Sequence, residues 1–347
     1  MKVETIIGGE FECIRTNVEP VKNNCVFTPF TFSSGRTALY NIITCCIEKL
    51  QCKKVILPDY LCDSIIKIVE SIGVAFDFYH ILDNLIPDWG SISTKCELGG
   101  VILFIDYYGI IDNEPTIRKI KEEYNNIVVI KDLVQAPYHI DETSLADFQF
   151  TSFRKCFAVP DGSWVITKHQ INQPVKEPKF AEYKMAASYL KSIRQYGDFG
   201  DDIYLDLYSK GEGLVGSHMD EDMSDFTKQH LLSMDWKRVS LLRKRNSDVV
   251  IKGLKTMGIT PIAKPHETAI PLFIPIALEN RDIVRRKMFE SNIFLPVHWP
   301  LEETMSKKYG LATGAKYSKV ELSIIVDQRY GTSEMTRILE TLEKSIK

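Results

Sequence analysis

Residues Ala146–Thr167 read ADFQFTSFRKCFAVPDGSWVIT. An apolar run leads into Ser-Phe-Arg-Lys, a Pro-Asp-Gly turn follows, and a second apolar run closes the segment. This pattern predicts two strands of a buried sheet, with Lys155 fixed between them. A lone lysine at a strand end is usually a surface residue, because lysines are almost never fully buried without a partner. The residues that precede Lys155 make it a candidate Schiff-base lysine instead.

The composition is that of an ordinary folded protein. The chain has 347 residues, of which 44% are hydrophobic and 26% charged, and its net charge is -3. This length fits one large domain and a smaller one. The balanced charge gives no electrostatic footprint for nucleic acid or a membrane surface. We expect a cytoplasmic protein without a signal peptide, a bilayer-spanning segment or a metal, whose eight scattered cysteines are free thiols.

Before the segment around Lys155, short apolar runs alternate with stretches in which apolar residues recur at helical spacing. Helical stretches separate the runs, with Gly73 at a helix stop and Pro115 near a helix start. Strands that alternate with helices predict parallel βαβ units and a three-layer α/β domain with a mostly parallel sheet. The expected strands are 55–57, Val74–His80, Gly100–Ile105, Ile127–Ile130 and Phe148–Phe153.

Polar side chains follow these strands at the points where they end. Tyr60, Asp106, Asp132, Gln135 and Lys155 each come just after an apolar run. Ligands of open α/β sheets bind beyond the carboxyl ends of the strands. Each residue has an alternative interpretation as a capping or loop residue, but their joint placement favours an active site.

A helix is also predicted from Ala38 to Leu50, directly after Ser34-Gly35-Arg36. Serine and glycine are favourable at a helix N-terminus. The free N–H groups and the helix dipole there favour an anion, typically phosphate. An ordinary helix cap is the alternative interpretation.

The remaining chain predicts an insertion followed by a second domain. The polar residues 176–216 hold one expected helix, Ala181–Tyr196, and a Gly/Asp-rich loop, and we expect an insertion or lid. The acidic stretch Ser217–Ser224 lacks the pattern of a calcium loop. The other expected features are an N-terminal hairpin or arm over residues 1–32, a long helix Asp225–Gly258, strands Pro271–Ile276 and Val320–Val326, helices Arg281–Ser291 and Ser333–Ile346, and domains at 1–225 and 226–347.

The order of these motifs resembles the DegT/StrS family of pyridoxal-phosphate-dependent aminotransferases of fold type I, which act on nucleotide-linked keto sugars. The resemblance covers the chain from about Phe32 to the C-terminus. It implies a PLP-transferase fold with a large cofactor-binding domain and a smaller C-terminal α+β domain. The motifs are Ser-Gly-x-x-Ala-Leu, Pro58 with Gly73, Asp-Tyr-Tyr-Gly, Ile-x-Asp-x-x-Gln-Ala, and Ser-Phe…Lys…Asp-Gly.

The resemblance implies a cofactor, pyridoxal 5'-phosphate, and a role for each matching residue. It implies a ping-pong transfer of an amino group from glutamate to a keto sugar, of the kind used in polysaccharide biosynthesis, by a homodimer. The implied roles are Lys155 as internal aldimine and proton carrier, Asp132 at the pyridine nitrogen, Gln135 near the phenolic oxygen, and Gly35, Arg36 and Ser152 at the phosphate.

The chain also departs from the family pattern. Arg36 stands where a threonine is common, and the serine and lysine of the Ser-Phe…Lys motif are two residues closer together than usual. The cofactor-stacking aromatic of the family falls at Cys62, so Tyr60 is the candidate for stacking. The segment that lends a phosphate contact from the neighbouring subunit falls at Asp220–Met223, without its asparagine or arginine.

His298, Arg329 and Tyr330 lie in predicted loops of the small domain and are candidate substrate-binding residues. Arg329 is suited to grip a carboxylate or a phosphate, although a salt bridge or a packed loop is the alternative. Two other functions stay open. One is a different pyridoxal-phosphate reaction on a non-sugar substrate, since a shared fold does not fix the reaction. The other is a catalytically silent binding protein.

Overall fold

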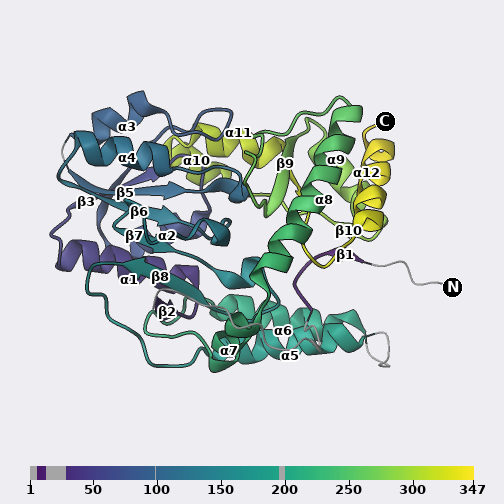
Figure 1. Ribbon diagram of the computed structural model, residues 1–347, viewed down its shortest axis with the longest axis horizontal. Helices are drawn as coiled ribbons and strands as arrows, with labels where there is room; N and C mark the ends of the chain where they lie inside the picture. The colour runs from purple at the N-terminus through teal and green to yellow at the C-terminus, as the bar shows by residue number, and fades with distance from the viewer. Residues whose placement is uncertain (1–5, 13–28, 98, 195–199) are drawn as a thin grey trace.

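The computed structural model describes residues 6–12, 29–97, 99–194 and 200–347. Within these residues, seven strands form one central sheet (Figure 1). Five neighbouring strands of this sheet are parallel to one another, and β8 is antiparallel to both of its neighbours. In spatial order the strands are β2 (Phe30–Phe32), β8 (Ser163–Thr167), β7 (Phe148–Phe150), β6 (Ile127–Asp132), β5 (Gly100–Ile105), β3 (Lys54–Pro58) and β4 (Ala75–Tyr79).

Helices connect these strands and pack on the sheet through apolar side chains. The five residues of β5 after Gly100 are buried, as a strand covered on both faces requires. Gly73 ends α2 with φ of 77°, a conformation that glycine adopts without strain. The predicted mostly parallel α/β fold is confirmed. The helices are α1 (Gly35–Glu48), α2 (Asp63–Ile72), α3 (Trp89–Cys96) and α4 (Glu114–Glu123).

The C-terminal part is a smaller α+β unit beside the large sheet (Figure 1). Its strands β9 (Phe273–Ala277) and β11 (Glu321–Ile325) are antiparallel. Of the N-terminal hairpin or arm predicted over residues 1–32, the two described strands do not pair with each other. Strand β1 (Ile7–Gly8) pairs with β10 (Ile293–Phe294) of the C-terminal part, whereas β2 lies at the edge of the large sheet. Residues 13–28 lie outside the described residues, and the division near residue 225 stays a prediction.

Two predicted segments differ from the structure. The Gly/Asp-rich loop is largely helix α6 (Asp201–Leu214), which packs against α5 (Lys179–Ile193) as a helical hairpin. Two aspartates in its first turn favour this helix start. The single helix expected over Asp225–Gly258 is divided, because the side chain of Asp235 accepts a hydrogen bond from Arg238 N and caps a new helix. The remaining helices are α7 (Asp225–Ser233), α8 (Trp236–Thr256), α9 (Arg281–Glu290), α10 (Glu303–Tyr309), α11 (Ala312–Val320) and α12 (Thr332–Ile346).

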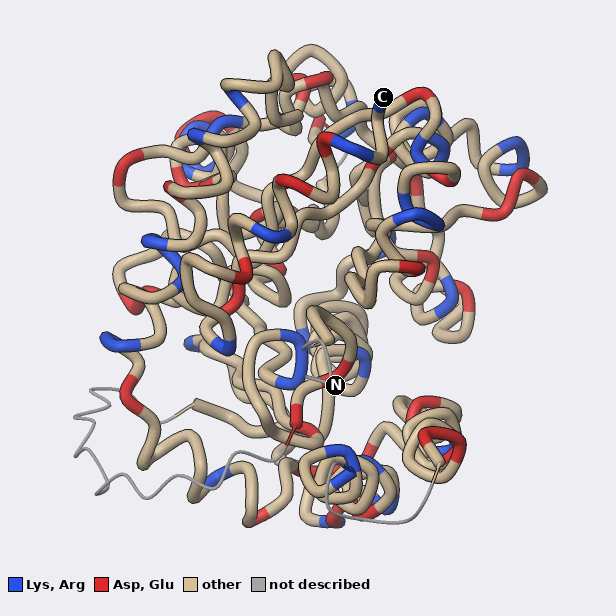
Figure 2. The backbone as a smooth tube through the Cα atoms, turned by 90° about the vertical axis from the view of Figure 1, so that its right-hand side faces the viewer, with Lys and Arg blue, Asp and Glu red and all other residues tan. Residues whose placement is uncertain are grey.

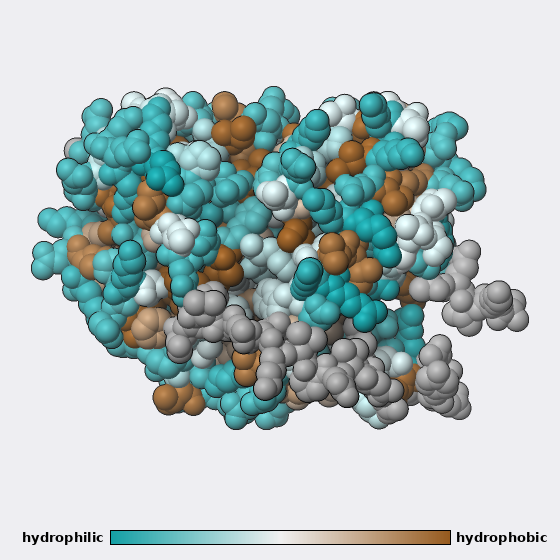
Figure 3. Space-filling model, in the orientation of Figure 1, coloured by the Kyte–Doolittle hydropathy of each residue, from teal (hydrophilic) through white to brown (hydrophobic). Residues whose placement is uncertain are grey.

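The surface is polar and mixed in charge. Lysine and arginine alternate with aspartate and glutamate along the backbone (Figure 2), and hydrophilic residues cover most of the face in Figure 3, with apolar residues scattered among them. None of the helices in the described residues is long and apolar enough to cross a membrane. The six described cysteines are free thiols, and Cys13 and Cys25 lie outside the described residues.

Candidate active site

A cavity of about 810 Å³ lies where strand ends of the large sheet meet the C-terminal part of the chain. Its walls include the first turn of α1, the segments after β6 and β7, residues 293–299 and residues 8–11. This is the edge of an open α/β sheet at which ligands bind. The cavity brings together Gly35, Arg36, Asp132, Gln135, Ser152, Lys155, His298 and Arg329 from the predicted site.

Asp132 ends β6 and is a buried carboxylate that lines the cavity. It is 4% exposed, and Val134 N donates a 2.8 Å hydrogen bond to its Oδ1. Burial raises the pKa of Asp132 to about 7; the bond from Val134 opposes this rise and the charge of Asp106 adds to it. Among the described residues no cation pairs with Asp132. A buried carboxylate in this setting is suited to a cationic ligand group.

Lys155 ends η3 (Phe153–Lys155), a short 3₁₀ turn that follows β7, and its accessible side chain lines the cavity. The positive charge of Arg154 lowers the pKa of Lys155 most, and partial loss of water around the amine inside the cavity lowers it further, while Glu212 opposes both. No described residue donates to, accepts from or pairs with its amine. A lowered pKa favours the neutral amine, which is the nucleophilic form.

Gln135 is oriented by the turn that follows β5. Its Oε1 accepts a 2.8 Å hydrogen bond from Tyr108 N, in η1 (Tyr107–Gly109). This bond fixes the Gln135 side chain with its oxygen toward the turn. No described residue accepts a hydrogen bond from the Gln135 amide nitrogen. The NH₂ group is therefore available as a donor to a ligand oxygen in the cavity.

The first turn of α1 forms the end of the cavity nearest Ser152. Ser34 caps the helix, and its Oγ accepts a hydrogen bond from Thr37 N at 3.2 Å. A Cβ on Gly35 would come within 3.3 Å of Ser152 Cβ and 3.1 Å of Val134 Cγ2. Glycine therefore keeps this corner open beside the N–H groups of the helix start. Such a corner is suited to an anion.

His298 lines the cavity from the C-terminal part of the chain. Burial and the charge of Lys155 lower the pKa of His298 to about 3, so its ring is neutral. Ser323 Oγ donates to Glu321 and lies 2.8 Å from His298 Nδ1. The serine hydroxyl therefore accepts from Nδ1–H, which leaves Nε2 as a hydrogen-bond acceptor.

Arg329 and Tyr330 hold the N-terminal segment beside the cavity. The guanidinium of Arg329 pairs with Asp327, with NH2 2.8 Å from Oδ2, and lies 4.2 Å from the centre of the Phe11 ring. It also donates to the carbonyl oxygens of residues 9 and 10. Tyr330 is outside the cavity lining, and its hydroxyl accepts a 2.7 Å hydrogen bond from Gly8 N. Arg329 is thus already engaged by protein groups.

Tyr60 is likewise outside the cavity lining. Its ring is 1% exposed, its hydroxyl lies 2.7 Å from the Tyr108 hydroxyl, and it also donates to the carbonyl of His298. Cys62, two residues further along the chain, lines the cavity instead. The structure therefore gives Tyr60 a structural role between the two walls of the cavity.

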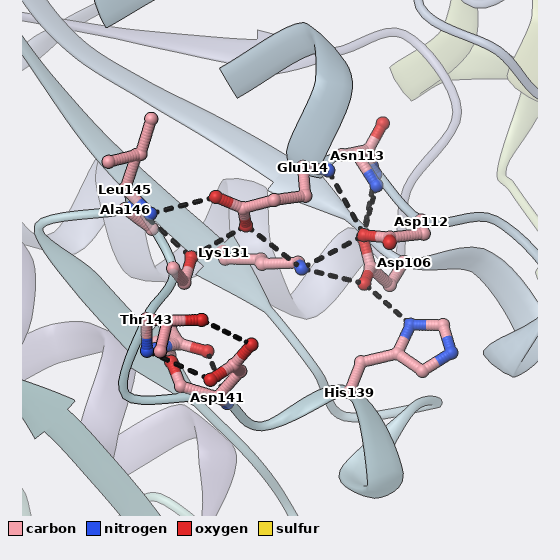
Figure 4. Close-up of polar contacts among 12 residues, drawn as sticks. Asp106, Asp112, Asn113, Glu114, Lys131, His139, Asp141, Thr143, Leu145 and Ala146 are labelled. Atoms are coloured by element: carbon pink, nitrogen blue, oxygen red, sulfur yellow. Dashed lines mark hydrogen bonds and ion pairs between the residues drawn. The ribbon is translucent and has the colours of Figure 1, made fainter. Parts of the chain in front are cut away.

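Asp106 belongs to a charge cluster next to the site (Figure 4). Its Oδ2 lies 3.4 Å from Lys131 Nζ and 2.8 Å from His139 Nδ1. Lys131 also pairs with Asp112 at 3.1 Å and Glu114 at 3.4 Å. Asp106, Asp112 and His139 have the spacing of metal ligands. The ammonium group of Lys131 is already the cation that these carboxylates share.

The sequence interpretation missed several residues that line the cavity. Arg154 has a side chain that is 9% exposed, and its place directly before Lys155 was a signal for it. Arg285, Arg286 and Phe289 on α9 line the cavity as well, beside Phe294. Nothing in the local sequence of α9 distinguished these residues from an ordinary solvated helix face.

Several solved structures with a similar fold are described as aminotransferases. A protein described as a sugar aminotransferase, Spr1654 from Streptococcus pneumoniae, matches in its PMP form with a TM-score of 0.69 and 15% identity, over 99% of this chain and 98% of that chain. The chain has the fold of sugar aminotransferases. DesV from S. venezuelae matches with a TM-score of 0.64 and 15% identity, over 90% of this chain and 83% of that chain.

A third match carries the family name in its description. It is a DegT DnrJ EryC1 StrS aminotransferase from Brucella abortus, with a TM-score of 0.60 and 14% identity, over 92% of this chain and 86% of that chain. No family model matches the sequence, and no curated protein is significantly similar to it. The fold that the resemblance to the DegT/StrS family implies is confirmed by these matches.

Proposed function

We propose that the protein is a pyridoxal-phosphate-dependent aminotransferase that moves an amino group from glutamate to a nucleotide-linked keto sugar. The observation that carries the proposal is that Lys155 and Asp132 line the same cavity. Neither of them has a charged partner among the described residues. In this fold the cofactor, when bound, supplies an electron sink for the carbanion formed at the substrate carbon.

Three features of the cavity fit this cofactor. Asp132 is a buried carboxylate that lacks a cation, and a pyridinium nitrogen supplies one. The NH₂ group of Gln135 is available to donate to a phenolic oxygen. The corner at Gly35 and Ser152 accepts a phosphate next to the N–H groups of α1, with Arg36 close by.

Lys155 has two tasks in this proposal. Its amine, with the lowered pKa, is the nucleophile that would hold the cofactor. The same amine, when free, would carry a proton from the substrate carbon. His298 faces the same space, and its Nε2 is suited to accept a hydrogen bond from a substrate hydroxyl.

The mouth of the cavity supports a large anionic substrate. Arg285 and Arg286 lie there with Phe289, whose ring is 58% exposed and stands 4.8 Å from the ring of Phe294, edge to face. Exposed guanidinium groups bind phosphates, and exposed aromatic rings stack on a base. We propose that the nucleotide lies at this mouth and the sugar next to Lys155. A homodimer that acts in the cytoplasm, in polysaccharide biosynthesis, belongs to the same proposal.

The test is a transfer assay with ¹⁵N-glutamate and a panel of nucleotide-linked keto sugars, beside keto acids and simple ketones. Mass spectrometry follows the label into the product. We expect labelled amino sugar with at least one nucleotide-linked acceptor. Transfer only to non-sugar ketones would contradict the sugar substrate, and cofactor binding without transfer to any acceptor would contradict the reaction. Light scattering of the active protein tests the dimer.

A further inference from the structure

The phosphate corner carries an unusual concentration of positive charge. Arg36 and Arg154 both line the cavity, and Arg154 directly precedes Lys155. The Nε atom of Arg154 is buried and has no hydrogen-bond partner. Guanidinium groups this close repel one another unless an anion lies between them.

One carboxylate joins these two arginines. Glu212 Oε1 lies 3.2 Å from Arg36 NH2, and Glu212 Oε2 lies 3.0 Å from Arg154 NH1. A third cation, Lys184 on α5, is 2.9 Å from Glu212 Oε2. Burial would raise the pKa of Glu212, but the charges of Arg154 and Lys184 outweigh it and lower the pKa to about 2. Glu212 is therefore ionised, although it does not itself line the cavity.

The end of α6 also fixes the side chain of Arg36. Val215 O accepts a 2.9 Å hydrogen bond from Arg36 NH1. Gly216, with φ of 75°, packs on the stem of the same side chain, because a Cβ there would stand 3.2 Å from Arg36 Cβ and Cδ. The end of α6, in the α5–α6 hairpin, and the turn that follows it thus hold both guanidinium groups.

The charges of this cluster do not balance. Arg36, Arg154 and Lys184 share Glu212, and Glu10 adds a distant contact of 3.9 Å to Lys184. The excess is positive, and it is greater when Lys155 is counted. A phosphate dianion at the start of α1 would neutralise it. Preorganised guanidinium pairs bind such dianions well, because little side-chain freedom is lost on binding.

We propose that the α5–α6 hairpin completes the phosphate seat from within the same chain, with Glu212 as the positioning residue that holds Arg36 and Arg154 toward a phosphate monoester. The inference rests on the proposed function, because the phosphate is that of the cofactor. It assigns the phosphate charge to residues of this chain, where the family pattern has a contact from the neighbouring subunit and this chain has Asp220–Met223 instead.

The proposal predicts whether loss of the Glu212 charge strengthens or weakens phosphate binding. Glu212 is negative, so a simple electrostatic view predicts tighter phosphate binding when its charge is removed. A positioning role predicts the opposite, because the two arginines lose their common partner. Loss of one charge-assisted hydrogen bond corresponds to roughly ten-fold in affinity.

The experiment titrates the full-length protein with pyridoxal phosphate and, separately, with pyridoxal, following the visible absorption band. We expect Glu212→Gln and Arg36→Gln to weaken pyridoxal phosphate binding by about ten-fold and not to weaken pyridoxal binding. The matched control is Asp206→Asn, on the same helix, whose partner is the exposed Lys210 at 2.7 Å. Inorganic phosphate should slow hydrogen exchange in α6 of the wild type, but not of Glu212→Gln.

The outcomes separate the two proposals. Equal or tighter pyridoxal phosphate binding by Glu212→Gln would overturn the positioning role and leave the aminotransferase proposal intact. An equal loss with pyridoxal and pyridoxal phosphate would also overturn it, because the defect would not depend on phosphate. If the wild type itself gave no band with pyridoxal phosphate, the proposed function would fail first.

Discussion

Lys131 lies near the end of β6 and Lys155 follows the neighbouring strand β7, but the surroundings of the two lysines are opposite. Lys131 is 3% exposed and pairs with Asp106, Asp112 and Glu114. Burial lowers the pKa of Lys131, but these carboxylates outweigh it and the net pKa is raised. Lys155 lines a cavity beside Arg154, and its pKa is lowered.

Asp106 and Asp132 differ in the same way, since only Asp106 has a charged partner among the described residues. Asp106 is fully buried and shares its charge with Lys131 and His139 (Figure 4). Asp132, whose carbonyl accepts a 3.1 Å hydrogen bond from Asp106 N, has no cation among the described residues. Lys131 and Asp106 form an ion pair with each other, here called the closed pair, which stabilises the strand ends. Lys155 and Asp132, here called the open pair, both line the cavity, and a ligand bound there can interact with both of them.

The largest effect is expected at the open pair. Lys155→Ala should abolish turnover, because the same amine anchors the cofactor and carries the proton. The measurement is the rate of amino transfer, with Lys168→Ala, an exposed lysine beyond β8, as control. Turnover by Lys155→Ala at the control rate would remove this lysine from the chemistry.

Asp132→Asn should keep the fold and the cofactor but lower kcat by roughly two to four orders of magnitude, in the range of a lost acid–base or charge partner. The amide has nearly the same shape but cannot keep the pyridine nitrogen charged. Cofactor affinity and kcat are measured on the same preparation. A wild-type kcat with bound cofactor would show that the open aspartate is not needed.

The closed pair should respond in stability instead. Lys131→Met leaves Asp106 buried without its ammonium partner, and removing one member of a buried ion pair costs about 3–5 kcal/mol. The free energy of unfolding in urea measures this loss. For the part of the protein that remains folded, kcat should change little. A stable Lys131→Met protein with a greatly reduced kcat would reverse the assignment of the two lysines.

The smallest effect is a pH dependence of the cofactor-free protein. The pKa of Asp132 is about 7 in the folded state and near its ordinary value of 4 in the unfolded chain. The folded protein therefore keeps a proton that the unfolded chain releases. The stability that Asp132 contributes is present below about pH 4 and is lost as pH rises through 7. This difference corresponds to at most roughly 4 kcal/mol.

The comparison with Asp132→Asn isolates this group. Burial also raises the pKa of Glu321 to about 7 and of Asp161 to about 6, so both add a dependence of the same sign. The melting temperature of the wild type relative to Asp132→Asn should fall between pH 5 and 8. Added pyridoxal phosphate should remove this fall, because it supplies the missing cation. A constant difference across this range would mean that Asp132 is ionised throughout.

Much of the fold could be predicted from local patterns. The run Gly100–Ile105 is apolar throughout because both faces of the strand are covered, and Gly73 ends a helix as its conformation requires. The order of polar residues after successive strands indicated the cavity, since parallel strands bring their carboxyl ends to one edge. These signals depend on neighbours in the sequence.

The remaining features depend on contacts between distant residues. The division of the long helix needed the cap at Asp235, which local periodicity conceals. Tyr60 and Cys62 are two residues apart, and only the packed loop shows which of them lines the cavity. Glu212 reaches Arg154 across 58 residues of sequence, and Arg329 reaches the N-terminal segment across more than 300. No local pattern predicts such pairs.

The most direct test of the open pair is the visible absorption spectrum of the purified protein with pyridoxal phosphate, before and after glutamate. The wild type should develop a visible absorption band that colours the protein yellow and disappears when glutamate is added, and Lys155→Ala should not develop it. A band that does not change when glutamate is added, or one that persists in Lys155→Ala, would contradict the account of Lys155 and Asp132 as the reactive centre.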